Sequence, residues 1–224
     1  MVKQTWMKLI AQLAGRLVYI VLSSMLITIV GGGTTFLRRP VGAIYLLLWA
    51  LWWAVTFLGR RRGARSDYDR TQRAIVTISG FLSVPTLILA PPWEYAHLAG
   101  PLPRDGLLAW AGLIFFAAGI ALQTAAMWAL RGYYTVRLGI QPSHRLVTSG
   151  PYRLVRHPGY LSYLLSLTGV GLAMSSLIGL GLAILVVPFI VWRIGYEEEM
   201  LLREFGEEYR AYQRRTRRLI PGLY

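Results

Sequence analysis

The residues best suited to chemistry lie in segment 144–160, which separates two long apolar stretches of this 224-residue chain. Gly150-Pro151 and His157-Pro158 within it are strong turn signals. Pro158 suits the first turn of a helix, because the N–H that proline lacks has no partner there. Arg156 and His157 would then stand at a helix N-terminus, where backbone N–H groups can receive an anionic group. The residues alone leave two interpretations open, a ligand site and a basic loop that binds lipid headgroups.

A second charged cluster, Arg193 to Glu199, directly follows the last apolar stretch. Helical spacing places Arg193 and Glu197 on one face, whereas Glu198 lies about 140° around the helix from Arg193. Such a pattern is typical of a solvated helix with a surface ion pair worth about 0.3–0.5 kcal/mol. Arg193 nevertheless follows Trp192 at the expected membrane edge, where ionisable residues tend to be functional. This position makes Arg193 a candidate functional residue, with a solvated surface pair as the alternative.

Composition excludes several kinds of protein. The chain has no cysteine, which excludes a disulfide scaffold and a Cys-ligated zinc or iron–sulfur site. It has three histidines and no His-x-x-x-His pair, so no metal site is predicted. Hydrophobic residues make up 55% of the chain, which excludes intrinsic disorder. Charged residues make up only 15%, against about 25% in soluble domains, and this balance indicates a polytopic membrane protein.

Five apolar stretches are candidates for crossing a bilayer, which takes about 20 mostly apolar residues. The first four cover about residues 15–30, 41–58, 74–90 and 107–130, and Pro91-Pro92 is expected to stop the third. The fifth, residues 161–192, is too long for one crossing, so we predict a helical hairpin broken near residues 174–176. The fold class is thus all-α, with about five or six transmembrane segments, a retained first helix and a C-terminal hairpin. Leu201, Phe205, Tyr209 and Tyr212 then predict an amphipathic tail helix.

The basic residues set the expected orientation. The chain carries 24 Lys and Arg against 10 Asp and Glu, a formal net charge of +14. Most of the arginines fall in segments 60–73, 131–156 and 203–218, which lie on one side of the membrane if the hairpin crosses twice. Short loops rich in Lys and Arg stay cytoplasmic, so both termini are expected in the cytoplasm, at a bacterial or archaeal inner membrane. Arg38, Arg39 and Arg104 fall on the other side, which this rule does not explain. No nucleic-acid-binding motif accompanies the arginines, so no nucleic-acid partner is expected.

An ordered set of C-terminal residues resembles the isoprenylcysteine carboxyl methyltransferase family, which belongs with the membrane phospholipid methyltransferases. The set comprises Leu146 to Tyr152, Arg156-His157-Pro158-x-Tyr160, Arg193-x-x-x-Glu197-Glu198, Phe205-Gly206-x-x-Tyr209-x-x-Tyr212 and Arg218-Leu219-Ile220-Pro221. The resemblance covers roughly the last 95 residues of the chain. The chain is therefore divided into N-terminal transmembrane helices, residues 1–130, and a methyltransferase motif region, residues 131–224, with the hairpin and a cytosolic tail.

The resemblance implies an integral membrane methyltransferase that uses S-adenosylmethionine and acts on a lipophilic acceptor, by carboxyl methylation of an isoprenylcysteine-like substrate. It implies a cytosolic C-terminal cofactor-binding region; the sequence contains no dinucleotide-binding glycine motif after a strand. The residues implied to bind the cofactor are His144, Leu146, Val147, Gly150, Pro151, Tyr152, Arg156, His157, Pro158, Tyr160, Glu198, Tyr209 and Tyr212. The resemblance also implies the predicted catalytic residues, Arg193, which matches a family arginine associated with substrate and activity, and Glu197 in the same motif. Gly159 stands where a larger residue is common.

Three alternatives stay open at this stage. The acceptor can be a phospholipid amine or a small thiol instead of a carboxylate. The protein can instead be an NADPH-dependent membrane reductase of the steroid-reductase type, whose architecture and basic tail are similar. It can also be a non-catalytic protein whose arginines hold anionic lipid, each worth about 1 kcal/mol near the surface. Binding of S-adenosylhomocysteine would support the methyltransferase, and binding of NADPH would support the reductase. Binding of neither would support the non-catalytic protein.

Overall fold

The computed structural model describes residues 2–59, 89–98, 100–130 and 145–220, and these are almost entirely helical. The elements are α1 (Val2–Val30), α2 (Thr34–Arg38), α3 (Pro40–Gly59), α5 (Ala90–His97), α6 (Leu107–Leu130), the 3-10 helix η3 (Gly150–Arg153), α7 (Pro158–Ala173) and α8 (Leu177–Arg215). The predicted all-α fold is thereby confirmed. The third predicted span lies outside the described residues except for its last two, and the total number of crossings stays a prediction.

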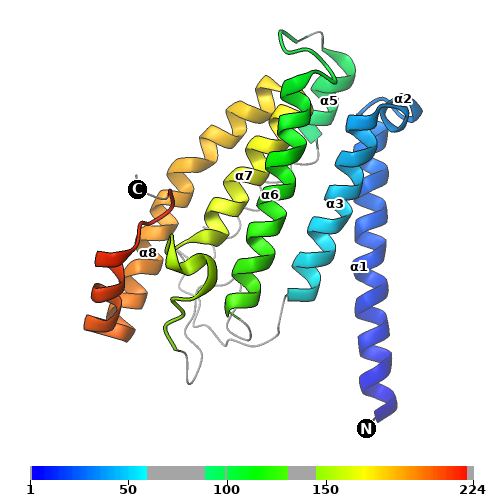
Figure 1. Ribbon diagram of the computed structural model, residues 1–224. Helices are drawn as coiled ribbons and strands as arrows, with labels where there is room; N and C mark the ends of the chain where they lie inside the picture. Colours follow the sequence, from blue (N-terminus) through cyan, green and yellow to red (C-terminus); the bar gives the residue numbers. More distant parts are fainter. Residues whose placement is uncertain (1, 60–88, 99, 131–144, 221–224) are drawn as a thin grey trace.

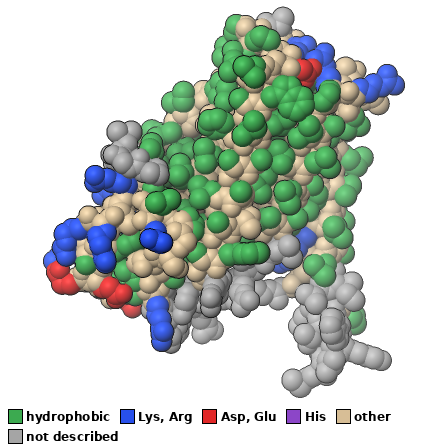
Figure 2. Space-filling view, viewed as in Figure 1, with side chains coloured by type: hydrophobic (Ala, Val, Ile, Leu, Met, Phe, Trp, Pro, Cys, Tyr) green, Lys and Arg blue, Asp and Glu red, His purple; other side chains and the backbone are tan. Residues whose placement is uncertain are grey.

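Four helices are long and apolar enough to cross a membrane. They are residues 11–30 of α1, residues 40–57 of α3, α6, and α8. The predicted bounds of α6 are confirmed at residues 107–130, whereas α1 begins at Val2, well before the predicted residue 15. Figure 2 shows a broad apolar surface over the middle of the molecule, with charged side chains towards its ends. This distribution is the one that a helical bundle needs when its middle faces lipid.

The helices run between two ends of the molecule (Figure 1). One end holds the N-terminus, the C-terminal ends of α3 and α6, segment 145–157 and the last part of α8. The other end holds α2, α5 and the turn between α7 and α8. Two of the predicted basic segments, 145–156 and 203–218, therefore gather at the first end, as far as they are described, and segment 60–73 lies outside the described residues.

The predicted hairpin is confirmed, and its turn is firmly fixed. α7 ends at Ala173, Ser175 adopts a positive φ of 48°, and α8 starts at Leu177. The Ser176 hydroxyl accepts from the N–H of Gly179 at 2.8 Å, as an N-cap residue does. The buried carboxylate of Glu94, from α5, accepts from the N–H groups of Leu177 and Ile178 at 3.1 and 2.9 Å. A carboxylate at the positive end of a helix dipole stabilises the helix start, so α5 anchors α8.

Close packing between α6 and α7 sets the position of the hairpin. A Cβ on Gly112 would lie 2.2 Å from the backbone nitrogen of Ala173, and one on Gly169 would lie 2.5 Å from the nitrogen of Phe116. Because only glycine leaves room for this backbone approach, the glycines serve contact within one chain. Near the start of α7, a Cβ on Gly119 would likewise lie 2.8 Å from the carbonyl oxygen of Ser162, so α7 is packed against α6 along its length.

Two predictions were wrong in detail. Pro91-Pro92 lies inside a helix, in the first turn of α5, where proline is tolerated; the span that it was expected to stop lies outside the described residues up to residue 88. The tail is not one amphipathic stripe, because Gly206 interrupts α8 with φ 49° and ψ −120°. Beyond that residue Tyr209 and Tyr212 are buried, whereas Phe205 before it is only half-buried. After the kink at Gly206, α8 therefore packs against the bundle through Tyr209 and Tyr212.

Candidate active site

The chain before α7 and the chain after α8 pair along their backbones. Val155 and Arg217 form a parallel bridge. The N–H of Arg156 donates to the carbonyl of Arg217 at 2.8 Å, and the N–H of His157 donates to that of Arg218 at 3.0 Å. Since Pro158 opens α7, this pairing fixes the start of α7 against the C-terminal tail, and the charged part of α8 supplies the side chains that lie against both.

The buried carboxylate of Glu198 is the centre of this region. Its Oε1 accepts from Nε of Arg156 at 2.8 Å and lies 3.3 Å from Nε2 of His157. Its Oε2 accepts from Nε of Arg218 at 2.9 Å and from Nε2 of Gln213 at 3.5 Å. Glu198 and His157 are 3% and 4% exposed. We name Glu198, Arg156, His157 and Arg218 the Glu198 cluster; it joins three segments that are distant in sequence.

Glu198 stays ionised in this setting. Twenty residues of α8, from Leu177 to Tyr196, already cover about 30 Å, the thickness of a bilayer core, so Glu198 lies beyond the spanning part. Burial alone would raise the pKa of Glu198, but hydrogen bonds from His157 and Arg156 and the charge of Arg156 lower it to about 2. The carboxylate therefore balances cationic partners at neutral pH. Arg156 also donates from Nη1 to the carbonyls of Gln213 and Thr216, which satisfies the C-terminal end of α8.

A second group of side chains lies beside the Glu198 cluster, where the apolar part of α8 ends. The hydroxyl of Tyr160 accepts from Nε of Arg193 at 2.7 Å and donates to Oε2 of Glu197 at 2.9 Å. His157 connects the two groups, because its Nδ1 lies 3.9 Å from the same Glu197 oxygen. Arg193 and Glu197 both contact the Tyr160 hydroxyl, so the prediction that they share one helix face is confirmed. A guanidinium at such a place can bind a carboxylate or phosphate through two parallel hydrogen bonds.

Two buried tyrosines of the tail complete the region. Tyr212 donates from its hydroxyl to the carbonyl of Tyr152 at 2.7 Å, which ties the tail to η3. Tyr209 is 1% exposed, and its hydroxyl has no hydrogen-bond partner among the described residues. Buried polar groups in native proteins nearly always have a partner. The Tyr209 hydroxyl is therefore a donor for which a bound molecule can supply the acceptor.

The remaining predicted site residues are distributed around this core. His144 lies outside the described residues. Leu146, Val147, Pro151 and Tyr152 are half-buried, and Gly150 opens η3 with a positive φ of 60°. A Cβ on Gly159 would meet no described atom within 4 Å, so the described residues leave this side of the start of α7 uncrowded. Gln213 and Thr216, which the sequence interpretation missed, take part through Glu198 and Arg156; no local spacing signal indicates either of them.

Comparison with known proteins gives consistent matches. The model of the isoprenylcysteine carboxyl methyltransferase (ICMT) family matches residues 111–203. A probable protein-S-isoprenylcysteine O-methyltransferase of Oryza sativa subsp. indica is 30% identical over 131 residues, which cover 57% of this chain and 69% of that protein. The human protein-S-isoprenylcysteine O-methyltransferase is 32% identical over 115 residues, which cover 50% of this chain and 40% of that protein. The solved structure of a eukaryotic intramembrane Ras methyltransferase ICMT shares the fold, with a TM-score of 0.60, 20% identity and coverage of 93% of this chain and 75% of that one.

Proposed function

The chain belongs to the isoprenylcysteine carboxyl methyltransferase family and is an integral membrane methyltransferase, and from this premise we propose its donor, its acceptor and its site. The donor is S-adenosylmethionine. The acceptor is the carboxylate of an isoprenylcysteine-like substrate, whose prenyl chain lies in the membrane. The Glu198 cluster organises the donor site, and Arg193 receives the acceptor.

The observation that carries the acceptor proposal is the position of Arg193. Arg193 directly follows the apolar part of α8 and precedes its charged part. A carboxylate on a lipid whose chain lies in the membrane would therefore be at the same depth as Arg193. Nε of Arg193 is held by the Tyr160 hydroxyl, which is itself oriented by Glu197. A guanidinium has five N–H donors, so it can hold Tyr160 and an acceptor carboxylate together. The protein then supplies orientation, which is worth several kcal/mol in a two-substrate reaction (about 7–11 at most).

The residues present suit the donor. S-adenosylmethionine would supply a methyl group on a positively charged sulfur; the acceptor oxygen would bond to the methyl carbon as the carbon–sulfur bond breaks and S-adenosylhomocysteine leaves. The Tyr209 hydroxyl, which has no partner among the described residues, would donate to it, together with the predicted residues of segment 146–152. No described atom crowds the side of Gly159 nearby, where a larger residue would narrow the site. Both oxygens of Glu198 already accept from protein donors, so for Glu198 and Arg156 the contacts favour a positioning role within the donor site. A carboxylate acceptor carries no proton, so no general base is required.

We further propose that the end of the molecule with the Glu198 cluster faces the cytosol. The described basic segments 145–156 and 203–218 gather there, as the positive-inside rule expects of cytoplasmic segments. The relatives reported above come from eukaryotes, so they lend no support to the bacterial or archaeal inner membrane that the sequence interpretation favoured.

Donor binding tests the proposal independently of the acceptor. We expect the purified protein in lipid nanodiscs to bind S-adenosylhomocysteine in isothermal titration calorimetry, with no displacement by NADPH. Tyr209→Phe should weaken this binding about tenfold, because a buried hydrogen bond contributes about 0.5–1.5 kcal/mol. Tyr196→Phe is the matched control, since Tyr196 is exposed on the same helix. Binding of NADPH in place of S-adenosylhomocysteine, or equal affinity in Tyr209→Phe and wild type, would contradict the proposed donor site.

A further inference from the structure

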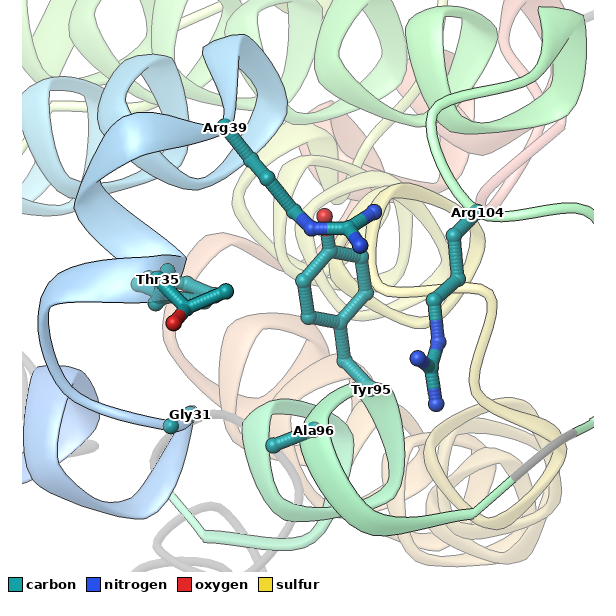
Figure 3. A pocket seen from close by; sticks show the side chains of 8 residues that line it. Gly31, Thr35, Arg39, Tyr95, Ala96 and Arg104 are labelled. Carbon is teal, nitrogen blue, oxygen red and sulfur yellow. The ribbon is translucent and has the colours of Figure 1, made fainter.

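The end of the molecule opposite the Glu198 cluster carries the arginines that the charge rule leaves unexplained. Arg39 and Arg104 line a cavity of about 180 Å³ between α2 and α5, together with Thr35, Phe36, Tyr95 and the glycines of the turn after α1. Figure 3 shows Thr35 on the α2 side of this cavity and the Tyr95 ring on the α5 side, with the two arginines near the ring. The cavity is far from the proposed methyl-transfer site and has no part in it.

Both guanidinium groups are held in place by the protein. Nη1 of Arg39 pairs with Oδ2 of Asp105 at 2.7 Å, and Nη2 of Arg104 donates to the carbonyl of Leu98 at 2.7 Å. The Tyr95 hydroxyl donates to Oδ1 of Asp105 at 2.8 Å. The guanidinium carbons of Arg39 and Arg104 lie 5.6 and 5.7 Å from the centre of the Tyr95 ring. The donors are thus arranged before any ligand arrives, which lowers the entropic cost of binding.

The cavity has the charge and size for a small anion. Asp105 balances Arg39, whereas Arg104 forms no ion pair within the described part of the chain, so the pocket keeps a positive charge. The Thr35 hydroxyl adds a neutral donor to the lining. A volume of about 180 Å³ is below the roughly 300–1,000 Å³ of pockets for drug-sized ligands. A compact group with several acceptor oxygens, such as a phosphate, matches arginine donors best.

The position of the cavity indicates where such a phosphate comes from. It lies where α1 ends and just before α3 begins, and both helices are long and apolar enough to cross the membrane. When these two helices cross the bilayer, their ends at the cavity lie at the depth of the lipid headgroups. Directly before it on α1, Ile29 and Met25 are 68% and 54% exposed, so they offer an apolar surface to acyl chains. Charged side chains lie above the same apolar surface at this end in Figure 2.

We propose that this cavity binds the phosphate group of a phospholipid in the leaflet opposite the methyl-transfer site. Arg104 and Arg39 hold the phosphate oxygens, Thr35 donates a further hydrogen bond, and the acyl chains lie along α1. The neighbouring Glu94 in α5 caps α8. A bound lipid therefore also steadies the helix start on which the hairpin depends.

Native mass spectrometry of the full-length protein tests this site. We expect wild type purified in detergent to retain phosphatidylglycerol, but not diacylglycerol with the same acyl chains. Added phosphatidylglycerol should also raise the unfolding temperature of wild type. Arg104→Gln should retain about tenfold less phosphatidylglycerol, because the neutral amide replaces a charged donor to the phosphate oxygens. This variant leaves the Arg39–Asp105 pair intact, so loss of lipid would not be a loss of folding. Arg38→Gln is the control of equal charge, since Arg38 is exposed and does not line the cavity.

A second arm identifies the source of the phosphate. Displacement of phosphatidylglycerol by millimolar inorganic phosphate in wild type, but not in Arg104→Gln, would place both ligands in the same cavity and support phosphate recognition. Retention of inorganic phosphate without lipid would support the chemistry but overturn the lipid source. Equal retention of phosphatidylglycerol by wild type and Arg104→Gln, or equal retention of diacylglycerol and phosphatidylglycerol, would overturn the proposal.

Discussion

Replacing Glu198 with glutamine should reduce methyl transfer more than a hundredfold and destabilise the C-terminal tail. The carboxylate is 3% exposed and contacts Arg156, His157 and Arg218. A neutral amide would leave the guanidinium of Arg156, whose side chain is 8% exposed, without its counter-charge, a loss that costs about 3–5 kcal/mol. Each 1.36 kcal/mol corresponds to a factor of ten in rate. If part of this cost misplaces α7 against the tail, about 2.7 kcal/mol of it is enough for the expected hundredfold fall in methyl transfer. Initial rates and thermal unfolding in nanodiscs measure the two effects.

The adjacent residue provides a matched control for this substitution. Glu199 pairs with Arg203 at 3.6 Å, and the side chains are 67% and 83% exposed. Because such exposed pairs contribute about 0.5 kcal/mol or less, Glu199→Gln should be close to wild type in rate and in unfolding temperature. Similar behaviour of the two variants would show that the Glu198 cluster is not needed for the site.

Acid should weaken the same cluster. The pKa of Glu198 falls from 4.5 to about 2 on folding, so its contribution to stability is complete above about 4.5 and is lost as pH falls towards 2. Wild type should therefore lose unfolding temperature more steeply across this interval than Glu198→Gln, which has no such carboxylate. Parallel pH profiles for the two proteins would argue against an ionised Glu198 in the folded state.

Replacing Arg193 with alanine should nearly abolish transfer to a carboxylate acceptor while donor binding persists. Loss of two charge-assisted hydrogen bonds, at about 1.5–3 kcal/mol each, predicts a fall in kcat/KM of more than a hundredfold. Arg193→Lys keeps the charge but not the planar fork, and should recover only part of the rate. Tyr160→Phe removes the hydroxyl that holds Nε of Arg193, so it should raise KM by about tenfold.

Controls separate a binding role from a structural one. Arg203→Ala removes an exposed arginine of the same helix and should leave kcat/KM unchanged. Titration with S-adenosylhomocysteine should show wild-type affinity for Arg193→Ala, which demonstrates an intact donor site. Undiminished transfer by Arg193→Ala would remove Arg193 from the acceptor site.

Local patterns in the sequence predict some parts of this molecule well. The bounds of α6 and the break at residues 174–176 follow from apolar length and from small residues, which act locally. Helical spacing also separates Glu198 from Arg193 by about 140°. The structure agrees, because Arg193 and Glu197 contact Tyr160 while Glu198 faces Arg156 and Arg218.

Contacts between distant segments could not be predicted in the same way. Glu94 caps a helix more than 80 residues later, and no local pattern marks it as a cap. Arg156 and Glu198 are 42 positions apart, so their pairing depends on the hairpin and on the backbone bridge of Val155 with Arg217. Pro91-Pro92 was misread because proline is tolerated at the start of a helix as well as after its end. Which of these applies depends on tertiary contacts.

The product formed from a farnesylated N-acetylcysteine tests the central claim most directly. The protein in nanodiscs is incubated with this acceptor and with S-adenosylmethionine labelled in its methyl group, and the lipid product is treated with alkali. Carboxyl methylation forms a methyl ester, so alkali should release labelled methanol. The matching carboxamide should release none, because it has no carboxylate for Arg193 to bind. Label that stays on the lipid after alkali, or equal labelling of the carboxamide, would contradict the proposed reaction.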